Sequence, residues 1–154
     1  MDTIWKTTAV VTQTQIILRS LKHWTGRGLL PGNFPAAELA EKLFLAPFVV
    51  VSHGTEADPV LNYGNAAALG LWELTWAELS HTPSRLTAEA PDREERARLL
   101  AAVTANGFID DYSGVRISKT GRRFKISRAT VWNLISENGE PCGQAAMFDR
   151  WEFL

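Results

Sequence analysis

The feature that most constrains the fold is a pair of hairpin signals in the last third of the chain. Two turn segments, Lys119-Thr120-Gly121-Arg122 and Asn138-Gly139, separate three runs of residues that favour strands. Glycine in such a turn readily takes the positive φ that a tight hairpin needs. These signals predict an antiparallel meander, with strands at 115–117, at 123–135 and from 142 to about 150. A meander of this kind must bury at least one face against other elements.

The rest of the sequence supplies helices and two more strands. Apolar residues recur at helical spacing over residues 3–24, which predicts an amphipathic helix. Residues 91–105 begin with a proline and end before an Asn-Gly pair, which predicts a second long helix whose buried stripe is Ala97, Leu100 and Val103. The shorter expected elements are helices beginning near Pro35, Asn65 and Thr75, and strands at 48–51 and 60–63.

This order of elements predicts an α+β fold. We expect a five-stranded, mostly antiparallel sheet with helices packed on one face and an additional N-terminal helix. The chain has 154 residues, a length typical of one domain. We expect residues 1–34, the N-terminal helix and loop, to pack on a domain formed by residues 35–154.

Composition excludes several classes of protein. The chain has 16 basic and 17 acidic residues, and a net charge of −1 gives no bulk attraction to nucleic acid. Its single cysteine, Cys142, cannot form an internal disulfide, and its three histidines lack metal-ligand spacing. The longest apolar stretch, 43–51, is far shorter than the ~20 residues of a membrane-spanning helix, and the first residues show no signal-peptide pattern. We expect a cytoplasmic protein without a metal site, a membrane segment or a nucleic-acid partner.

A group of arginines forms the first candidate site. Arg93 and Arg96 flank the expected buried stripe of helix 91–105, and Asp110 and Asp111 follow that helix. Arg85 and Arg116 lie on either side of this segment. One interpretation is an ion-pair network that ties the helix to the sheet. The other is an anion or carboxylate site, since a guanidinium offers bidentate hydrogen bonds.

The long strand 123–135 presents an interrupted apolar pattern. Its even-numbered side chains are Phe124, Ile126, Arg128, Thr130, Trp132 and Leu134, so two polar residues break the stripe. Either a β-bulge near Arg128 shifts the alternation, or polar groups point into a cavity. We favour the bulge, because burying an unpaired arginine is costly. With a bulge, Val131, Asn133 and Ile135 face inward instead.

Two tryptophans form the second candidate site. Trp72 and Trp76 are four residues apart and share a face if one helix contains both. They are interpreted either as core packing or as the wall of a small-molecule cavity. Near Gln144, the small residues Gly143, Ala145 and Ala146 leave room for a ligand or for close packing. Asn65 fits a helix cap, with ligand binding as the alternative.

Several segments together resemble a known family. The step Tyr63-Gly64-Asn65, after two short strands, is similar to the opening of PAS domains. The remaining motifs resemble the MEKHLA branch of PAS-like domains over about residues 10–152, and they are Leu71-Trp72-Glu73, Trp76, Pro83-Ser84-Arg85, Arg93-Glu94-Glu95-Arg96, Tyr112 to Ser118, Gly121 to Phe124, Trp132 and Gly143-Gln144-Ala145-Ala146.

The resemblance implies a PAS-like sensory or interaction module, here of the free-standing bacterial type. MEKHLA domains also lie at the C-terminus of plant homeodomain–leucine-zipper factors, but this chain shows neither a homeodomain nor a leucine zipper. Flavin-photoadduct PAS domains use a cysteine in a helix after the mid-domain loop, whereas Cys142 is expected at the start of the last strand. Haem-binding PAS domains commonly take a histidine from the long helix, and residues 91–105 contain none. Both cofactors are disfavoured and the ligand stays open.

The sequence therefore predicts a signalling module that binds a small molecule, a protein partner or both, and that performs no catalysis. The chain shows no output domain, and its N-terminal helix is the expected element of a homodimer. One alternative is a small non-metal enzyme on a cone-shaped α+β fold, which would have to use Asp110, Asp111 or His53. Another is a pure dimerisation module with a filled core. The candidate pocket, between the sheet and the mid-domain helices, comprises Trp72, Trp76, Arg96, Arg116, Trp132, Asn133 and Gln144.

Overall fold

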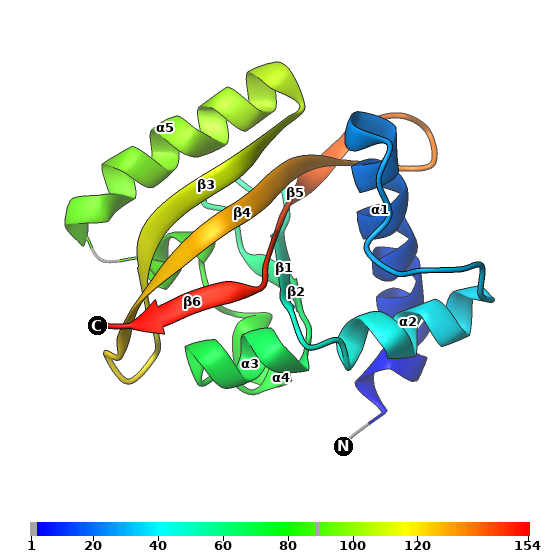
Figure 1. Ribbon diagram of the computed structural model, residues 1–154, viewed down its shortest axis with the longest axis horizontal. Helices are drawn as coiled ribbons and strands as arrows, with labels where there is room; N and C mark the ends of the chain where they lie inside the picture. Colours follow the sequence, from blue (N-terminus) through cyan, green and yellow to red (C-terminus); the bar gives the residue numbers. More distant parts are fainter. Residues whose placement is uncertain (1–2, 89) are drawn as a thin grey trace.

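A computed structural model describes residues 3–88 and 90–154, without the side chains of residues 90–93 and 96. Figure 1 shows α5 alongside β3 on one side of the molecule and α1 on the other. In chain order, the elements are η1 (Ile4–Lys6), α1 (Thr8–Thr25), α2 (Ala36–Phe44), β1 (Val49–His53), β2 (Leu61–Gly64), α3 (Ala66–Trp72), α4 (Trp76–Leu79), η2 (Ser84–Thr87), α5 (Ala90–Asn106), β3 (Phe108–Ile117), β4 (Arg123–Ile135), β5 (Pro141–Phe148) and β6 (Arg150–Phe153).

The sheet has the strand order β2-β1-β5-β4-β3, and every pairing along it is antiparallel. The predicted α+β fold with a five-stranded antiparallel sheet is confirmed. A sixth short strand, β6, pairs with the first half of β4. The sequence pattern predicted a single strand from 142 to about 150, but the chain turns at Asp149 and the last residues return along β4.

The two faces of the sheet carry separate apolar clusters. Neighbouring strand residues point to opposite faces, so Val50 joins the cluster on the α1 face while Val49 joins the cluster on the α3 face. The α1 face buries Ile17, Leu21 and Trp132 together. The opposite face, which α5 also covers, holds the candidate site.

A β-bulge in β4 decides which residues reach each face. Arg128 has a positive φ of 56° and an exposed side chain, as predicted for the bulge position. Before it, Phe124 and Ile126 point toward α3. After it, the alternation shifts by one residue, so Ala129 keeps that direction while Trp132 turns toward α1. The extra residue at the bulge therefore reverses which side chains of β4, the even-numbered or the odd-numbered, point toward α1.

The start of α3 is fixed by the fully buried side chain of Asn65. Its Oδ1 accepts hydrogen bonds from the backbone N–H groups of Val50 and Ala68, both at 3.1 Å. Its Nδ2 donates to the carbonyls of Leu43 at 3.1 Å and Phe48 at 2.8 Å. The predicted helix cap is confirmed, and the same side chain also joins α2 and β1 to α3.

The long helix α5 is confirmed, but its predicted buried stripe is only partly correct. Val103 is fully buried and Leu100 half-buried, whereas Ala97 is exposed. The helix α5 contacts β3 and β4, and its backbone hydrogen bonds with the sheet are made at Leu100 and Val103, in its C-terminal half. No helix among the described residues combines the length and the apolar character that crossing a membrane requires.

Candidate functional site

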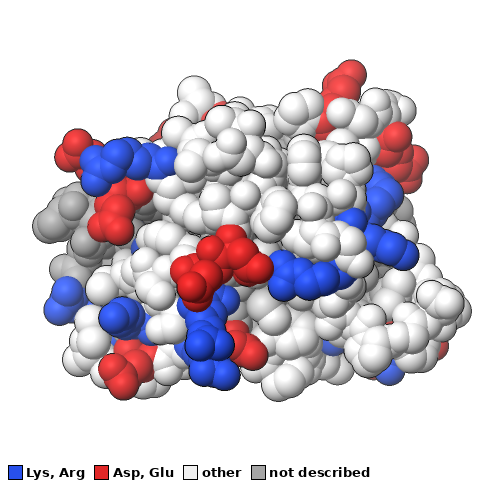
Figure 2. Space-filling view, turned by 45° about the horizontal axis from the view of Figure 1, so that its top comes forward, with Lys and Arg blue, Asp and Glu red and all other residues white. Residues whose placement is uncertain are grey.

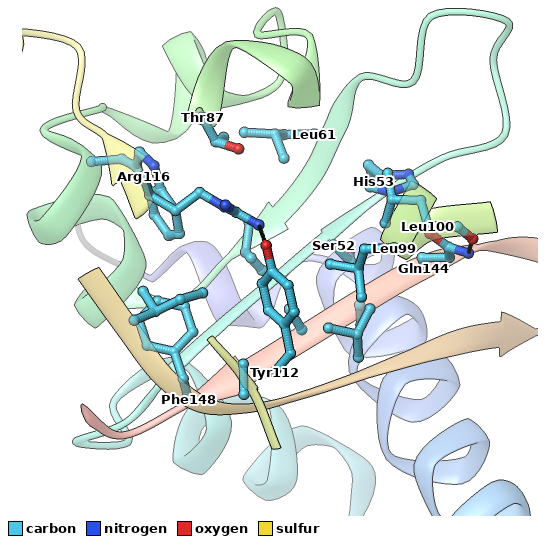
Figure 3. A pocket seen from close by; sticks show the side chains of 17 residues that line it. Ser52, His53, Leu61, Thr87, Leu99, Leu100, Tyr112, Arg116, Gln144 and Phe148 are labelled. Carbon is cyan, nitrogen blue, oxygen red and sulfur yellow. Dashed lines mark hydrogen bonds between the residues drawn. The ribbon is translucent and has the colours of Figure 1, made fainter. Parts of the chain in front are cut away.

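A cavity lies between α5 and the face of the sheet that carries Phe124 and Ile126. It has a volume of about 60 Å³, room for about four water-sized groups. Strands β1, β3, β4 and β5 form its floor, while Leu99 and Leu100 of α5 and Thr87 of η2 cover it (Figure 3). Its lining consists of Val51, Ser52, His53, Leu61, Trp72, Thr87, Leu99, Leu100, Tyr112, Arg116, Ile126, Ala129, Val131, Gln144, Ala145, Ala146 and Phe148.

Arg116 is the charged group of this cavity. Its side chain is buried, with 7% of the residue exposed. Nη1 donates to the carbonyl of Val115 at 2.9 Å, and Nη2 donates to the hydroxyl of Tyr112 at 3.2 Å, the contact drawn in Figure 3. A β-carbon at Gly114 would lie 2.4 Å from that hydroxyl, so the absence of a side chain at Gly114 leaves the space that the Tyr112 ring occupies.

The other charged groups near the site have partners elsewhere. Arg85 pairs with Asp58 at 3.1 Å, and Arg27 pairs with Asp110 at 3.0 Å. A hydrogen bond from Thr130, together with Arg27, holds the pKa of Asp110 below its usual range. Among the described side chains, no carboxylate lies within ion-pair distance of Arg116. Arg85 and Asp110 therefore do not pair with Arg116, and the predicted contribution of Arg93 and Arg96 to an ion-pair network lies outside the described side chains.

Gln144 connects β5 to α5. Its Nε2 contacts three acceptors: the Leu100 carbonyl at 3.1 Å, Thr104 Oγ1 at 3.0 Å and Asn133 Oδ1 at 3.0 Å. Asn133 in turn donates to the carbonyl of Val103 at 2.9 Å. The amide nitrogen of Gln144 is thus occupied, whereas its buried Oε1 has no hydrogen-bond partner among the described residues.

Trp72 closes the cavity beside Arg116. Its ring packs edge-on against Phe124 and Phe148, with centroid distances of 5.4 and 6.1 Å. Arg116 is the cross-strand partner of the same Phe124, so Trp72 and Arg116 share one end of the cavity. The indole Nε1–H of Trp72 is buried and has no acceptor in the described part of the chain.

Two residues predicted to line the pocket, Trp76 and Trp132, lie outside the cavity. Trp72 and Trp76 do not share a helix, because Glu73 has a φ of 59° and ends α3 between them. Trp76 packs instead against Phe44 and Tyr63.

Trp132 is fully buried on the α1 face, as the bulge requires, and so does not line the cavity. Asn133 lies beside the cavity and bonds Gln144. The predicted role of Arg96 falls outside the described side chains.

Several lining residues were not predicted, Tyr112 above all. Tyr112, Gly114 and Arg116 alternate along β3 and share one face of the sheet, which is a period-two signal. The sequence pattern predicted the strand only from Val115 onward, so Tyr112 fell outside it. His53, Thr87, Leu99 and Leu100 were also missed as lining residues.

The cavity is too small for a flavin. A pocket for a drug-sized ligand commonly has about 300–1,000 Å³, so a flavin exceeds the 60 Å³ available. Cys142 packs with the cluster on the α1 face, away from the cavity, and burial raises the pKa of its thiol. Within residues 3–88 and 90–154, no group of three His, Cys, Asp or Glu side chains is arranged to hold a metal ion.

Comparison with known sequences identifies one family and one curated relative. The model of the MEKHLA domain matches residues 11–153. The homeobox-leucine zipper protein ATHB-9 of Arabidopsis thaliana is 26% identical over 100 residues, which are 65% of this chain and 12% of that protein. The chain therefore matches a small part of its plant relative.

Comparison with solved structures finds PAS and light-oxygen-voltage domains. A PAS domain from Colwellia psychrerythraea has a TM-score of 0.63 at 14% identity, over 76% of this chain and 94% of that domain. An RNA-binding light-oxygen-voltage receptor has a TM-score of 0.64 at 19% identity, over 79% of this chain and 34% of that receptor. The PAS domain of a LuxR-family regulator from Burkholderia thailandensis, in complex with ethanol, has a TM-score of 0.54 at 20% identity. The match covers 74% of this chain and 95% of that domain. These likenesses show that the fold is that of PAS domains.

Proposed function

This chain belongs to the MEKHLA domain family, and from that premise we propose that it is a PAS-fold module that binds a small molecule between the sheet and α5. One observation supports this most directly. Two polar atoms in the cavity wall, Nε1 of Trp72 and Oε1 of Gln144, are buried without a partner among the described residues. Nearly all buried polar atoms in proteins have partners, so a polar occupant that accepts a hydrogen bond from Trp72 would supply one of the missing partners.

The size of the cavity favours a very small ligand. A volume of about 60 Å³ accepts a molecule of only a few non-hydrogen atoms. The similar PAS domain from Burkholderia thailandensis is in complex with ethanol, a molecule of that size. By analogy, we propose a ligand of comparable dimensions here.

Binding is proposed over catalysis because of the groups that line the cavity. Among the described side chains, its lining contains no aspartate or glutamate. Asp110 is paired with Arg27 and bonded by Thr130, and Asp111 is exposed. Of the groups that the enzyme alternative requires, only His53 reaches the cavity. The described residues therefore place no carboxylate in the cavity for acid–base catalysis.

The test uses the indole signal of Trp72 in NMR spectra of the ¹⁵N-labelled protein. The signal is assigned as the one missing from Trp72→Phe, and a panel of small alcohols, amides and carboxylates is then titrated. At least one probe is expected to shift it in a saturable manner. Ala146→Leu, which fills the cavity, should abolish that shift. Ala102→Leu, on the exposed side of α5, should preserve it. Failure of every probe to move the signal would refute the proposal.

The homodimer and a cytoplasmic location belong to the same proposal. Leu45, which is 55% exposed, borders an apolar groove formed by η1, α2 and residues 29–34. A second copy covering this groove would explain the exposure, and Leu45→Glu would then convert a dimer into a monomer in analytical ultracentrifugation.

We also propose that residues 1–34 fold as one unit with residues 35–154, because α1 shares its core with β4.

A further inference from the structure

The unpaired charge of Arg116 indicates which chemical class the cavity takes. The face shown in Figure 2 carries interspersed acidic and basic groups. Exposed ion pairs of the chain include Arg85–Asp58 and Lys119–Glu78. Arg116 differs from these in being buried and without a carboxylate partner among the described residues. A buried charge without a counter-charge is strongly disfavoured unless something else compensates it.

The hydrogen bonds of Arg116 leave room for a ligand. A guanidinium carries five N–H donors, and the structure uses one toward the Val115 carbonyl and one toward the Tyr112 hydroxyl. Both acceptors are neutral. The remaining N–H groups have no acceptor in the described part of the chain, and a carboxylate suits their planar geometry.

Other groups at the same end of the cavity fit an anion. The Trp72 indole is a donor only, and both Trp72 and Arg116 neighbour Phe124. The hydroxyl of Tyr112, which accepts from Arg116, is able to donate its own proton. Away from these donors, the walls are apolar, with Ile126, Ala129 and Val131 among them.

From this arrangement we propose that the ligand is a small monocarboxylate with a short alkyl chain. Its carboxylate would accept hydrogen bonds from Arg116 and Trp72, and its alkyl chain would lie against the apolar wall. Figure 3 shows Gln144 on the side of the cavity away from Arg116, so its Oε1, which is also an acceptor, does not face the carboxylate. This inference rests on the proposed function, since it names the occupant of the same cavity.

The experiment compares carboxylates with neutral molecules of the same shape. Sodium acetate, propionate and butyrate are titrated against acetamide, propanamide and butanamide at constant ionic strength, with the Trp72 indole signal as the readout. Loss of a charge-assisted bond to a buried group weakens binding by about tenfold or more. The carboxylates are therefore expected to bind at least about tenfold more tightly than the matching amides.

Two variants locate the effect. Arg116→Gln should remove the preference for carboxylates, while Arg85→Gln, which changes a surface arginine paired with Asp58, should keep it. If Arg116→Gln does not fold, the ratio of carboxylate to amide affinity in the unmodified protein tests the preference for carboxylates by itself.

Three results would overturn the inference. Equal affinity for carboxylates and amides would leave the proposed small-molecule function standing with a neutral ligand. The same shift with sodium chloride alone would show a general anion effect. No shift with any probe would overturn the proposed function as well.

Discussion

The indole N–H of Trp132 donates to the backbone carbonyl of Ile17 at 3.2 Å, and both residues are fully buried. The bond connects β4 to α1 through the middle of the core on that face of the sheet. It also explains why this tryptophan serves the fold and does not line the cavity. The helix and the longest strand are thus joined by a specific hydrogen bond in addition to apolar packing.

Replacing Trp132 by Phe is expected to lower the free energy of unfolding by about 1–2 kcal/mol, because one buried hydrogen bond and part of the ring packing are lost. Trp76→Phe is the matched control, since Trp76 is only half-buried and its indole makes no hydrogen bond with a described residue. Urea unfolding followed by circular dichroism measures both. An equal loss in the two variants would contradict the role given to the Trp132–Ile17 bond.

Asn65→Ala is expected to lower the free energy of unfolding by about 3–5 kcal/mol. The substitution removes the four hydrogen bonds made by the side chain and leaves buried backbone groups without partners. Exposed Asn106→Ala serves as the control and should cost far less. Thermal unfolding of the two variants gives the comparison, and a loss below about 1 kcal/mol for Asn65→Ala would refute the prediction.

Arg116→Met is expected to leave the free energy of unfolding within about 1 kcal/mol of the unmodified protein in the absence of ligand. Removing a buried charge that has no carboxylate partner among the described residues offsets the loss of its two hydrogen bonds and of its cation–π contact with Tyr112. Chemical denaturation measures the change. A loss of several kcal/mol would mean that Arg116 serves the fold, and it would favour the structural interpretation of this residue.

Asp110 gives a prediction about pH. Because Thr130 and Arg27 lower the pKa of its carboxyl in the folded state, this group stabilises the fold above its unfolded pKa of about 3.9. The contribution is lost as the pH falls through the lower, folded value. Between pH 6 and pH 2, stability should therefore fall more steeply in the unmodified protein than in Asp110→Asn. Thr130→Val should raise the pKa toward its usual value, which a ¹³C NMR titration of the carboxyl measures.

Gly114→Ala tests the position of Tyr112. A β-carbon there lies 2.4 Å from the Tyr112 hydroxyl, so the ring must move and its contact with Arg116 must weaken. We expect carboxylate affinity to fall about tenfold with the fold intact. Gly70→Ala is the matched control, because its β-carbon meets nothing within 4 Å. A change in affinity in both variants would contradict this reasoning.

The sequence predicted most of the elements, and the bulge shows why. Arg128 and Thr130 interrupt an apolar alternation, and only an extra residue in the strand avoids burying the arginine. The bulge also directs Asn133 toward α5. Here the local pattern and the tertiary packing agree, so the sequence was sufficient.

The site was harder to predict because tertiary pairing decides it. Asp110 and Asp111 are poor strand residues, yet they lie in β3 because the chain on both sides of them pairs with β4. Without that strand, Tyr112 could not be placed opposite the helix. Similarly, Trp72 and Trp76 have helical spacing, and only the left-handed backbone at Glu73 separates them.

The helix α5 is attached to the sheet in a different way from α1. Of its described side chains, only Val103 is buried, and the amides of Asn133 and Gln144 hold its backbone at Val103 and Leu100. Water can replace amide hydrogen bonds at little net cost, whereas apolar contacts resist exposure. Polar bonds therefore hold the described part of α5 to the sheet, and the two apolar clusters of the sheet contain no described residue of α5.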